Sequence, residues 1–144
     1  MITIKNMCSN KFKYDINDMT AFAAKVLGIT QNVTVTVVNN DILLNKLSNK
    51  DYDIHAFIYR TPIPNMFLLT MRKNVSFPDS VFCHELVHLK QYLDNRLNVN
   101  TDNKTYTWMG KIYTNLTPYE LRPWESEAML LASKIMRKFK KENK

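Results

Sequence analysis

The sequence predicts a single α+β domain that spans residues 1–144. Three observations predict it. Stretches with helical spacing of apolar residues alternate with β-branched stretches, no repeat or low-complexity tract interrupts them, and the chain has only 2 glycines. With 45% hydrophobic residues, a chain of this length has enough apolar side chains for one core.

The first half of the chain predicts one helix and three strands. The helix runs from Asp15 to Leu27, because its apolar residues recur at helical spacing and Gly28 follows as a stop. The first strand is Val33 to Val38, which is rich in β-branched residues. Two more strands, Ile54 to Arg60 and Met66 to Arg72, flank a turn that contains two prolines.

The next predicted helix begins in the segment Phe77 to Ser80, with Asp79 as its N-cap. Its apolar face is formed by Val81, Phe82, Leu86, Leu89 and Leu93. The run His84-Glu85-Leu86-Val87-His88 is set into this helix. Histidine and glutamate in a buried helix cost free energy unless they are hydrogen-bonded or metal-bound, so the pattern favours a site over packing.

The H-E-x-x-H spacing indicates a metal site. At about 3.6 residues per turn, His84 and His88 lie above one another on one helix face, and Glu85 lies about 100° around the helix. Neutral imidazole is a good zinc ligand, and a catalytic zinc keeps one position for water beside three protein ligands. We expect His84 and His88 to bind one Zn²⁺ per chain and Glu85 to act as general base. The same pattern also arises by chance in helices whose histidines are ordinary core or surface residues.

The third ligand is expected from a second helix that begins at Pro123, a residue suited to a first helical turn. Its apolar stripe consists of Trp124, Ala128, Leu131, Ala132, Ile135 and Phe139. Counted at about 100° per residue, Glu125 points about 50° from the centre of this stripe and Glu127 about 110° from it. We therefore expect Glu125 as the ligand, with Glu127 as the alternative. Either can instead be an acidic residue favoured by the helix dipole.

Between the two helices, Tyr106 to Thr114 predicts a small hairpin around Gly110. Tyr106, Tyr113 and Tyr119 are candidates to donate a hydrogen bond to the oxyanion of a hydrolytic intermediate. The alternative is that all three only pack. His55 falls on a predicted strand and is expected to be exposed rather than catalytic.

The H-E-x-x-H run, followed by a glutamate in an E-x-x-A context, resembles the gluzincin branch of zinc metallopeptidases, and the short chain resembles its minimal single-domain members. Trp108-Met109-Gly110 and the stretch Tyr119 to Ala128 are similar to small phage- and plasmid-type proteins of that kind. The resemblance covers roughly residues 54 to 140. It implies a peptidase in which Glu85 is the catalytic base and the metal ligands are His84, His88 and Glu125.

The resemblance also implies a zincin-like plan. An N-terminal helix accompanies a small twisted mixed β-sheet packed on the active-site helix, and a C-terminal helix carries the glutamate. One edge strand of such a sheet lines the cleft, and we expect it to be Met66 to Arg72, where an extended peptide can pair through its main chain. One position departs from the family. Many gluzincins have Asp after the Ala to orient a ligand histidine, whereas this chain has Met129, so either another acceptor replaces it or the site is weaker.

The alternative function is a structural or interaction protein with the zincin fold, such as a phage virion component, in which zinc is absent or only structural. Its partners would be virion assembly proteins, whereas the peptidase acts on a peptide or protein substrate. Glu85 is the residue that a retired enzyme is free to lose first. Its presence beside the expected ligands favours the peptidase.

The net charge is +7, and much of it lies in a basic helix end or tail at residues 135–144 and just before it. The basic residues are Lys134, Arg137, Lys138, Lys140, Lys141 and Lys144. Such a segment can contact an acidic partner or nucleic acid. It lacks the interleaved aromatics of a base-stacking surface, and cations are favoured at a helix C-terminus, so a solvated helix end is the preferred interpretation.

The sequence contains no apolar stretch of the length of a signal peptide or a membrane span. We therefore expect no membrane association and a cytoplasmic location, in the host cell or in the virion if the protein is phage-encoded. Cys8 and Cys83 are expected to be reduced thiols. Cys83 is not expected to bind the metal, because neighbours on a helix point about 100° apart.

Overall fold

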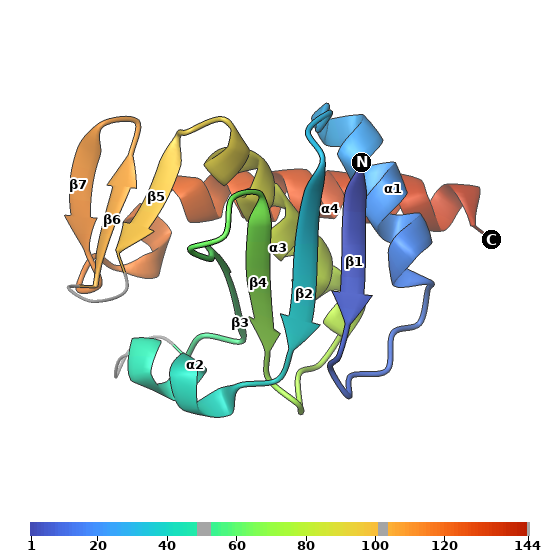
Figure 1. Ribbon diagram of the computed structural model, residues 1–144, viewed down its shortest axis with the longest axis horizontal. Helices are drawn as coiled ribbons and strands as arrows, with labels where there is room; N and C mark the ends of the chain where they lie inside the picture. The colour runs from blue at the N-terminus through green and yellow to red at the C-terminus, as the bar shows by residue number, and fades with distance from the viewer. Residues whose placement is uncertain (49–52, 101–103, 144) are drawn as a thin grey trace.

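The computed structural model describes residues 1–48, 53–100 and 104–143 and has the predicted α+β class. Its larger sheet has the order β1-β2-β4-β3, in which β3 is antiparallel to β4 and the other neighbours are parallel. The strands are β1 (Ile2–Asn6), β2 (Val33–Val38), β3 (Ala56–Arg60) and β4 (Met66–Met71). Three helices, α1 (Ile16–Leu27), α3 (Pro78–Leu93) and α4 (Pro123–Glu142), lie on one face of this sheet (Figure 1).

A second, antiparallel sheet stands beyond β3 at one end of the molecule (Figure 1). It consists of β5 (Leu97–Asn100), β6 (Thr105–Trp108) and β7 (Lys111–Thr114), so the predicted hairpin is confirmed and is joined by a third strand. A short helix α2 (Asp41–Leu47) connects β2 toward β3, and the 3₁₀ turn η1 (Tyr119–Leu121) leads into α4. Sequence analysis missed β1, α2 and β5.

The helix α1 has the ends that the sequence predicts. The Asp15 carboxylate accepts hydrogen bonds from the N–H groups of Asn17 and Asp18, which would otherwise lack partners in the first turn. Gly28 ends the helix in the left-handed region, at φ 73°, which is unstrained only for glycine. These local signals fix the helix that covers β1 and packs on α3.

The alternation of β2 places the core between the sheet and the helices. Val33, Val35 and Val37 are buried and the residues between them are half-buried. The buried face of β2 joins apolar residues of α1, α3 and α4 in one cluster, so the two predicted ligand-bearing helices are anchored on the sheet by the main core.

The prediction that Asp79 caps α3 is wrong. The helix begins at Pro78, with Phe77 as the cap residue and no side-chain cap. The Asp79 carboxylate instead accepts hydrogen bonds from the N–H groups of Lys13 and Tyr14, each at 2.9 Å. Asp79 therefore ties the segment before α1 to the start of the motif helix.

The prediction that Met66 to Arg72 is the edge strand beside the site is also wrong. β4 lies inside the sheet, between β2 and β3, and the strand next to the motif helix is β3. β3 pairs on one side with β4 and with no other strand among the described residues. Its other side is the edge that a further strand can use.

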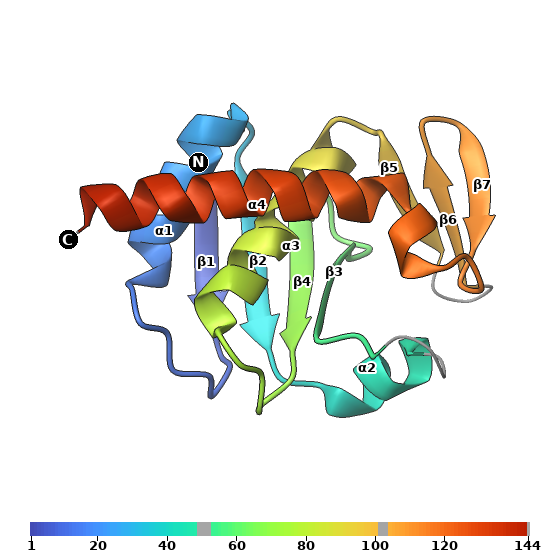
Figure 2. The same ribbon diagram turned by 180° about the vertical axis from the view of Figure 1, so that it is seen from behind.

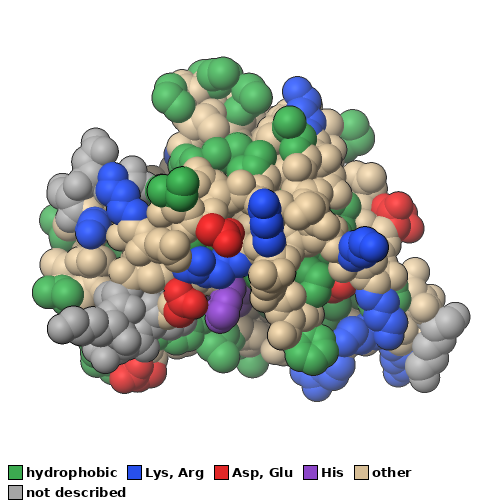
Figure 3. All heavy atoms as spheres, turned by 90° about the horizontal axis from the view of Figure 1, so that it is seen from below, with side chains coloured by type: hydrophobic (Ala, Val, Ile, Leu, Met, Phe, Trp, Pro, Cys, Tyr) green, Lys and Arg blue, Asp and Glu red, His purple; other side chains and the backbone are tan. Residues whose placement is uncertain are grey.

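The helix α4 begins at Pro123 as predicted and crosses over α3 and α1, in front of them in Figure 2. Its first turn is held in place by Trp124, which is 1% exposed and stacks on Tyr106 with ring centroids 5.1 Å apart. At its other end the predicted basic segment is helical through Glu142, and Lys144 lies outside the described residues. Basic side chains gather at this end of the molecule (Figure 3).

Both cysteines are unpaired, as predicted. Cys83 is fully buried, and burial raises the pKa of its thiol to about 12. No helix in the described ranges combines the length and the apolar character needed to cross a membrane.

Candidate metal centre

Two imidazoles and one carboxylate converge between α3 and α4. His84 and His88 lie one turn apart on α3, and their rings meet edge to face with centroids 4.9 Å apart. The Nε2 atoms of both rings lie 2.9 Å from the same oxygen, Oε1 of Glu125, in the first turn of α4. The structure therefore brings together all three residues predicted as ligands.

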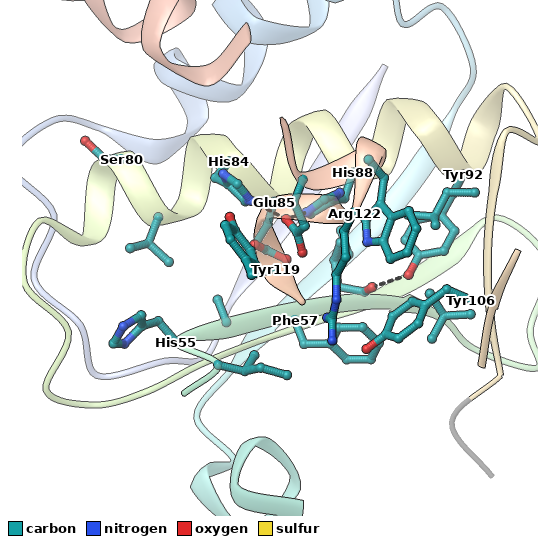
Figure 4. Close-up of a pocket in the computed structure, with 18 residues that line it drawn as sticks. His55, Phe57, Ser80, His84, Glu85, His88, Tyr92, Tyr106, Tyr119 and Arg122 are labelled. Atoms are coloured by element: carbon teal, nitrogen blue, oxygen red, sulfur yellow. Dashed lines mark hydrogen bonds and ion pairs between the residues drawn. The ribbon is translucent and has the colours of Figure 1, made fainter. Parts of the chain in front are cut away.

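Glu85 lies beside this group on the side of β3 (Figure 4). It is 5% exposed, and one of its carboxylate oxygens lies within 4.8 Å of a ring nitrogen of each histidine. Burial raises the pKa of the Glu85 carboxyl, while the positive charges on His88 and His84 act to lower it. A carboxylate with a raised pKa is a stronger base than that of an exposed glutamate.

Two glutamates could thus complete a metal site with the histidines. Glu125 is the closer of the two, at 2.9 Å from both Nε2 atoms, and its carboxylate bridges them. Glu85 belongs to a looser group. By this distance Glu125 is the better placed of the two to be a third ligand, which would leave Glu85 for proton transfer.

Glu127, the alternative third ligand, is engaged elsewhere. Its two oxygens form a bidentate ion pair with Arg96, with both N–O distances 2.8 Å. The Arg96 guanidinium holds the pKa of Glu127 below its usual value. The sequence places Glu127 about 110° from the centre of the apolar stripe, but it is half-buried because Arg96 from the neighbouring loop covers it.

Gln91 fixes the orientation and the tautomer of His88. The Nε2 group of Gln91 donates to the backbone oxygen of Trp124 at 3.0 Å and to Glu127 Oε1 at 3.1 Å, and both of these can only accept. The Gln91 side-chain oxygen must therefore face His88, whose Nδ1 lies 2.7 Å away and donates to it. With its proton on Nδ1, neutral His88 carries a lone pair on Nε2.

This tautomer makes the position between His88 and Glu125 a cation site. The Nε2 lone pair points at a carboxylate oxygen 2.9 Å away, and two lone pairs at this distance repel unless a cation lies between them. Without a metal ion the cation is a proton. Burial alone would lower the pKa of His88, but the negative charges of Glu125 and Glu85 and the hydrogen bonds raise it to about 9. Burial acts to raise the pKa of Glu125, yet the two imidazoles hold it well below its usual value.

The dimensions of the site also suit zinc. Ligand atoms bound tetrahedrally at about 2.0–2.1 Å lie about 3.3 Å from one another. The two 2.9 Å separations to Glu125 are within a few tenths of an ångström of that value. Two imidazole nitrogens and one carboxylate oxygen are also the ligand types of a catalytic zinc site, in which a fourth position is left for water.

A cavity of about 250 Å³ opens over these residues (Figure 4). Its walls are α3 on one side and residues 54–58, including the start of β3, on the other. Tyr106 and Tyr119 line it, as predicted for an oxyanion stabiliser. Tyr113 does not, because its ring packs edge-on against Trp124. His55 is exposed, as predicted, and lies at the end of the cavity opposite to Tyr106, away from the group formed by His84, His88 and Glu125 (Figure 4).

The position that departs from the gluzincin pattern has no role in this site. Met129 is 52% exposed on α4. Among the described residues His88, not His84, has a hydrogen-bond partner on its second ring nitrogen, and this partner is Gln91. Gln91 thus gives one histidine the fixed hydrogen-bond partner that a metal-binding imidazole commonly has on its second ring nitrogen.

Sequence reasoning missed three residues of the site: Gln91, Tyr92 and Arg122. Gln91 could have been found, because a residue three positions after His88 shares its helix face. Tyr92 donates its hydroxyl to the backbone oxygen of Ile58 at 2.7 Å and so joins α3 to β3. No sequence signal marks Arg122, which precedes the helix that carries Glu125.

No protein-family model matches the chain, and neither the curated proteins nor the solved structures include a significant match. The chemistry of this site must therefore be argued from the positions of its own residues.

Proposed function

We propose that this protein is a zinc-dependent peptidase that hydrolyses peptide bonds with Glu85 as general base. The observation that carries the proposal is the approach of both Nε2 atoms, of His84 and His88, to one oxygen of Glu125 at 2.9 Å. The resemblance of the H-E-x-x-H and E-x-x-A segments to the gluzincins, with their zincin-like fold, supports the same function.

The roles of the residues follow from their chemistry. His84, His88 and Glu125 hold the ion, which when bound lowers the pKa of water and polarises a substrate carbonyl group. Glu85 accepts a proton from the attacking water and later donates it to the leaving amine nitrogen. The raised pKa of Glu85 favours the second transfer, because a carboxyl group with a higher pKa stays protonated nearer to neutral pH.

Tyr119 and Tyr106 are the two cavity tyrosines that can stabilise the oxyanion. Tyr119 lies by the end of the cavity that holds His84 and Glu85, whereas Tyr106 lies by Arg122 (Figure 4). We assign the role to Tyr119. Tyr119→Phe should lower kcat by about 10²-fold or more with a small change in KM, since a lost oxyanion donor acts in the transition state. If Tyr106→Phe has this effect and Tyr119→Phe does not, the assignment is wrong.

The start of the β3 edge, before Ile58, offers a place for the substrate main chain, because the backbone oxygen of Ile58 already accepts from Tyr92. Residues 54–58 line the cavity, and a peptide that lies along this edge can form main-chain hydrogen bonds whatever its side chains are. A series of substrates in which one peptide N–H at a time is methylated tests this. At least one methylation should lower kcat/KM about tenfold or more. Equal turnover across the series would exclude pairing with β3.

Metal content of protein purified without an affinity tag tests the ligand set. Wild-type protein should hold one zinc ion per chain, and Glu125→Gln should lose it. Glu127→Gln is the matched control, because it makes the same chemical change two residues away in the ion pair with Arg96. Zinc that remains bound in Glu125→Gln, or is absent from wild-type protein supplied with zinc, would refute the proposed site.

Glu85→Gln separates catalysis from metal binding. The variant should keep its zinc and lose at least about 10²-fold in kcat on a peptide substrate, because it cannot accept a proton. Zinc binding without turnover in the wild-type protein, over a broad peptide screen, would favour the structural alternative. Turnover that is unaffected by Glu85→Gln would refute the role of Glu85.

A further inference from the structure

Arg122 places a permanent positive charge in the wall of the cavity. It is the residue before α4, three positions before Glu125, and it is 3% exposed. Figure 4 shows its guanidinium reaching across the cavity toward β3, between Tyr119 and Tyr106. An arginine stays protonated at all accessible pH values, so this charge cannot be removed by deprotonation.

The neighbours of Arg122 are neutral. Its Nε donates to the backbone oxygen of Thr117 and its Nη2 to that of Asn115, each at 2.9 Å. The guanidinium carbon also lies 5.1 Å from the centre of the Tyr106 ring. These contacts hold the guanidinium rigidly in one position without neutralising its charge.

No carboxylate of a described residue pairs with Arg122. The ion pairs of lysine and arginine side chains in the described ranges use Arg72, Lys90 and Arg96, all of which are more exposed. A buried charge without a counterion costs free energy of folding, and this cost is offset when an anion binds and forms an ion pair with it. The guanidinium of Arg96 is paired with the carboxylate of Glu127. Arg122 has no such carboxylate among the described residues, so an anion from outside the protein can pair with it.

The free part of the guanidinium opens onto the cavity. Among the described residues, the Thr70 hydroxyl is the one fully enclosed side-chain polar atom without a hydrogen-bond partner. The Arg122 guanidinium also hydrogen-bonds to the side chain of Tyr106, which lines the same cavity. Because Arg122 lines the cavity, a ligand there can reach the N–H groups on its cavity side. A planar fork with free N–H groups matches a carboxylate in two parallel hydrogen bonds.

The sum of the charges around the cavity leaves room for one anionic group on a ligand. If the proposed divalent ion is bound, the carboxylates of Glu85 and Glu125 balance it. The charge of Arg122 then remains in excess.

We propose that Arg122 binds a carboxylate of the substrate and makes the site selective for peptides that carry one near the scissile bond. This inference rests on the proposed peptidase function, because the carboxylate belongs to the peptide that the enzyme would cleave. The carboxylate can be the side chain of Asp or Glu or the free C-terminus of the peptide, since both present the same group to the guanidinium.

Binding to the Glu85→Gln variant supplied with zinc tests the inference without turnover. The probes are fluorescent alanine-rich peptides, and the neutral parent is acetylated and amidated. In one arm a single Glu is placed at each position in turn, and in the other the amide is replaced by a free C-terminus. Fluorescence anisotropy gives the Kd of each peptide.

At least one carboxylate peptide should bind about 10- to 100-fold more tightly than the neutral parent, which is the size of a hydrogen-bonded charge pair. The arm in which the preference occurs identifies the source of the carboxylate. Adding Arg122→Gln should abolish the preference and leave the Kd of the neutral parent nearly unchanged. Lys111→Gln is the matched control, because it removes one positive charge from an exposed position outside the cavity and should keep the preference.

The inference fails if every carboxylate peptide binds like the neutral parent while Arg122 is intact. It also fails if the preference survives Arg122→Gln. Since Arg122 holds two backbone carbonyls, circular dichroism must show that the variant is folded. If it is not, Arg122→Lys replaces it and should reduce the preference in part, because lysine keeps the charge but not the fork.

The outcomes separate this inference from the peptidase proposal. Zinc binding and turnover without any preference for a carboxylate would overturn the role of Arg122 alone. An Arg122-dependent preference in a protein that holds no zinc and cleaves no peptide would overturn the peptidase and leave an anion-binding cavity.

Discussion

Replacement of Gln91 by leucine should weaken metal binding although Gln91 is not expected to touch the ion. Gln91 is fully buried and forms three hydrogen bonds, of which the shortest, 2.7 Å, accepts the Nδ1 proton of His88. Leucine offers no acceptor. His88 is then free to rotate or to carry its proton on Nε2, and in that tautomer it cannot be a ligand through Nε2.

The expected loss in zinc affinity is about 10- to 100-fold, as for other groups that orient a metal-bound histidine. This corresponds to about 1.4–2.7 kcal/mol of binding free energy. The metal-free variant should also lose about 1–3 kcal/mol of stability, because His88 Nδ1 is left buried without a partner and the Trp124 carbonyl, which also belongs to the hydrogen-bond ladder of α4, loses one donor.

Competition with a chromophoric chelator gives the affinity, and the ¹⁵N chemical shifts of His88 report its tautomer. Glu127→Gln is the control, because the amide oxygen that it introduces can still accept from Gln91 while the ion pair with Arg96 is lost. It should change the affinity less than about threefold. A folded Gln91→Leu protein with wild-type affinity, or with the Nδ1–H tautomer unchanged, would refute the role of Gln91.

Three further predictions follow from the fold and the charges. In metal-free protein the pKa of His88 is raised from 6.5 to about 9, so the stabilisation by its charge is fully present below pH 6.5 and is lost as the pH rises through 9. Urea titrations should show that the free energy of unfolding falls by about 2–4 kcal/mol over this range. A free energy of unfolding that stays constant would contradict this prediction. Trp124→Ala should lower the free energy of unfolding by about 3–5 kcal/mol, because the indole is 1% exposed and stacks on Tyr106; denaturant titration measures this. A loss below about 1 kcal/mol would mean that the packing of Trp124 does not stabilise the wall of the cavity. Phe77→Asn should stabilise the protein by up to about 1 kcal/mol and so raise its melting temperature slightly, because Phe77 has φ 56° and is 80% exposed. A lower melting temperature would show that the Phe77 ring is needed.

The convergence of the proposed metal ligands could be predicted because their geometry is local. His88 follows His84 by one helical turn of α3, and the apolar stripe of α4 sets the direction of Glu125, so helical periodicity alone places each group. Capping signals gave α1 and the start of α4 for the same reason.

The remaining features depend on contacts between distant segments. Asp79 was taken as a cap, but its partners are the N–H groups of Lys13 and Tyr14, which lie far away in sequence. The inward side of Glu127 is created by Arg96, which a helical wheel of α4 cannot include. The choice of β3 rather than β4 as the edge follows from the parallel pairing of β4 with β2, which places β4 inside the sheet and which no local pattern in β4 reveals.

The joint position of the ligands on two helices has a consequence for the rest of the chain. His88 and Glu125 are 37 positions apart in sequence, and the segment between them forms the β5–β7 sheet and the turn η1. An ion held by both residues would therefore act as a removable cross-link around that sheet. By the loop-closure relation used for disulfides, such a link restricts the unfolded chain by about 3–4 kcal/mol. A chelator would then open this loop, so the sheet that stands beside the cavity would exchange its amide protons faster while the β1–β4 sheet stayed protected.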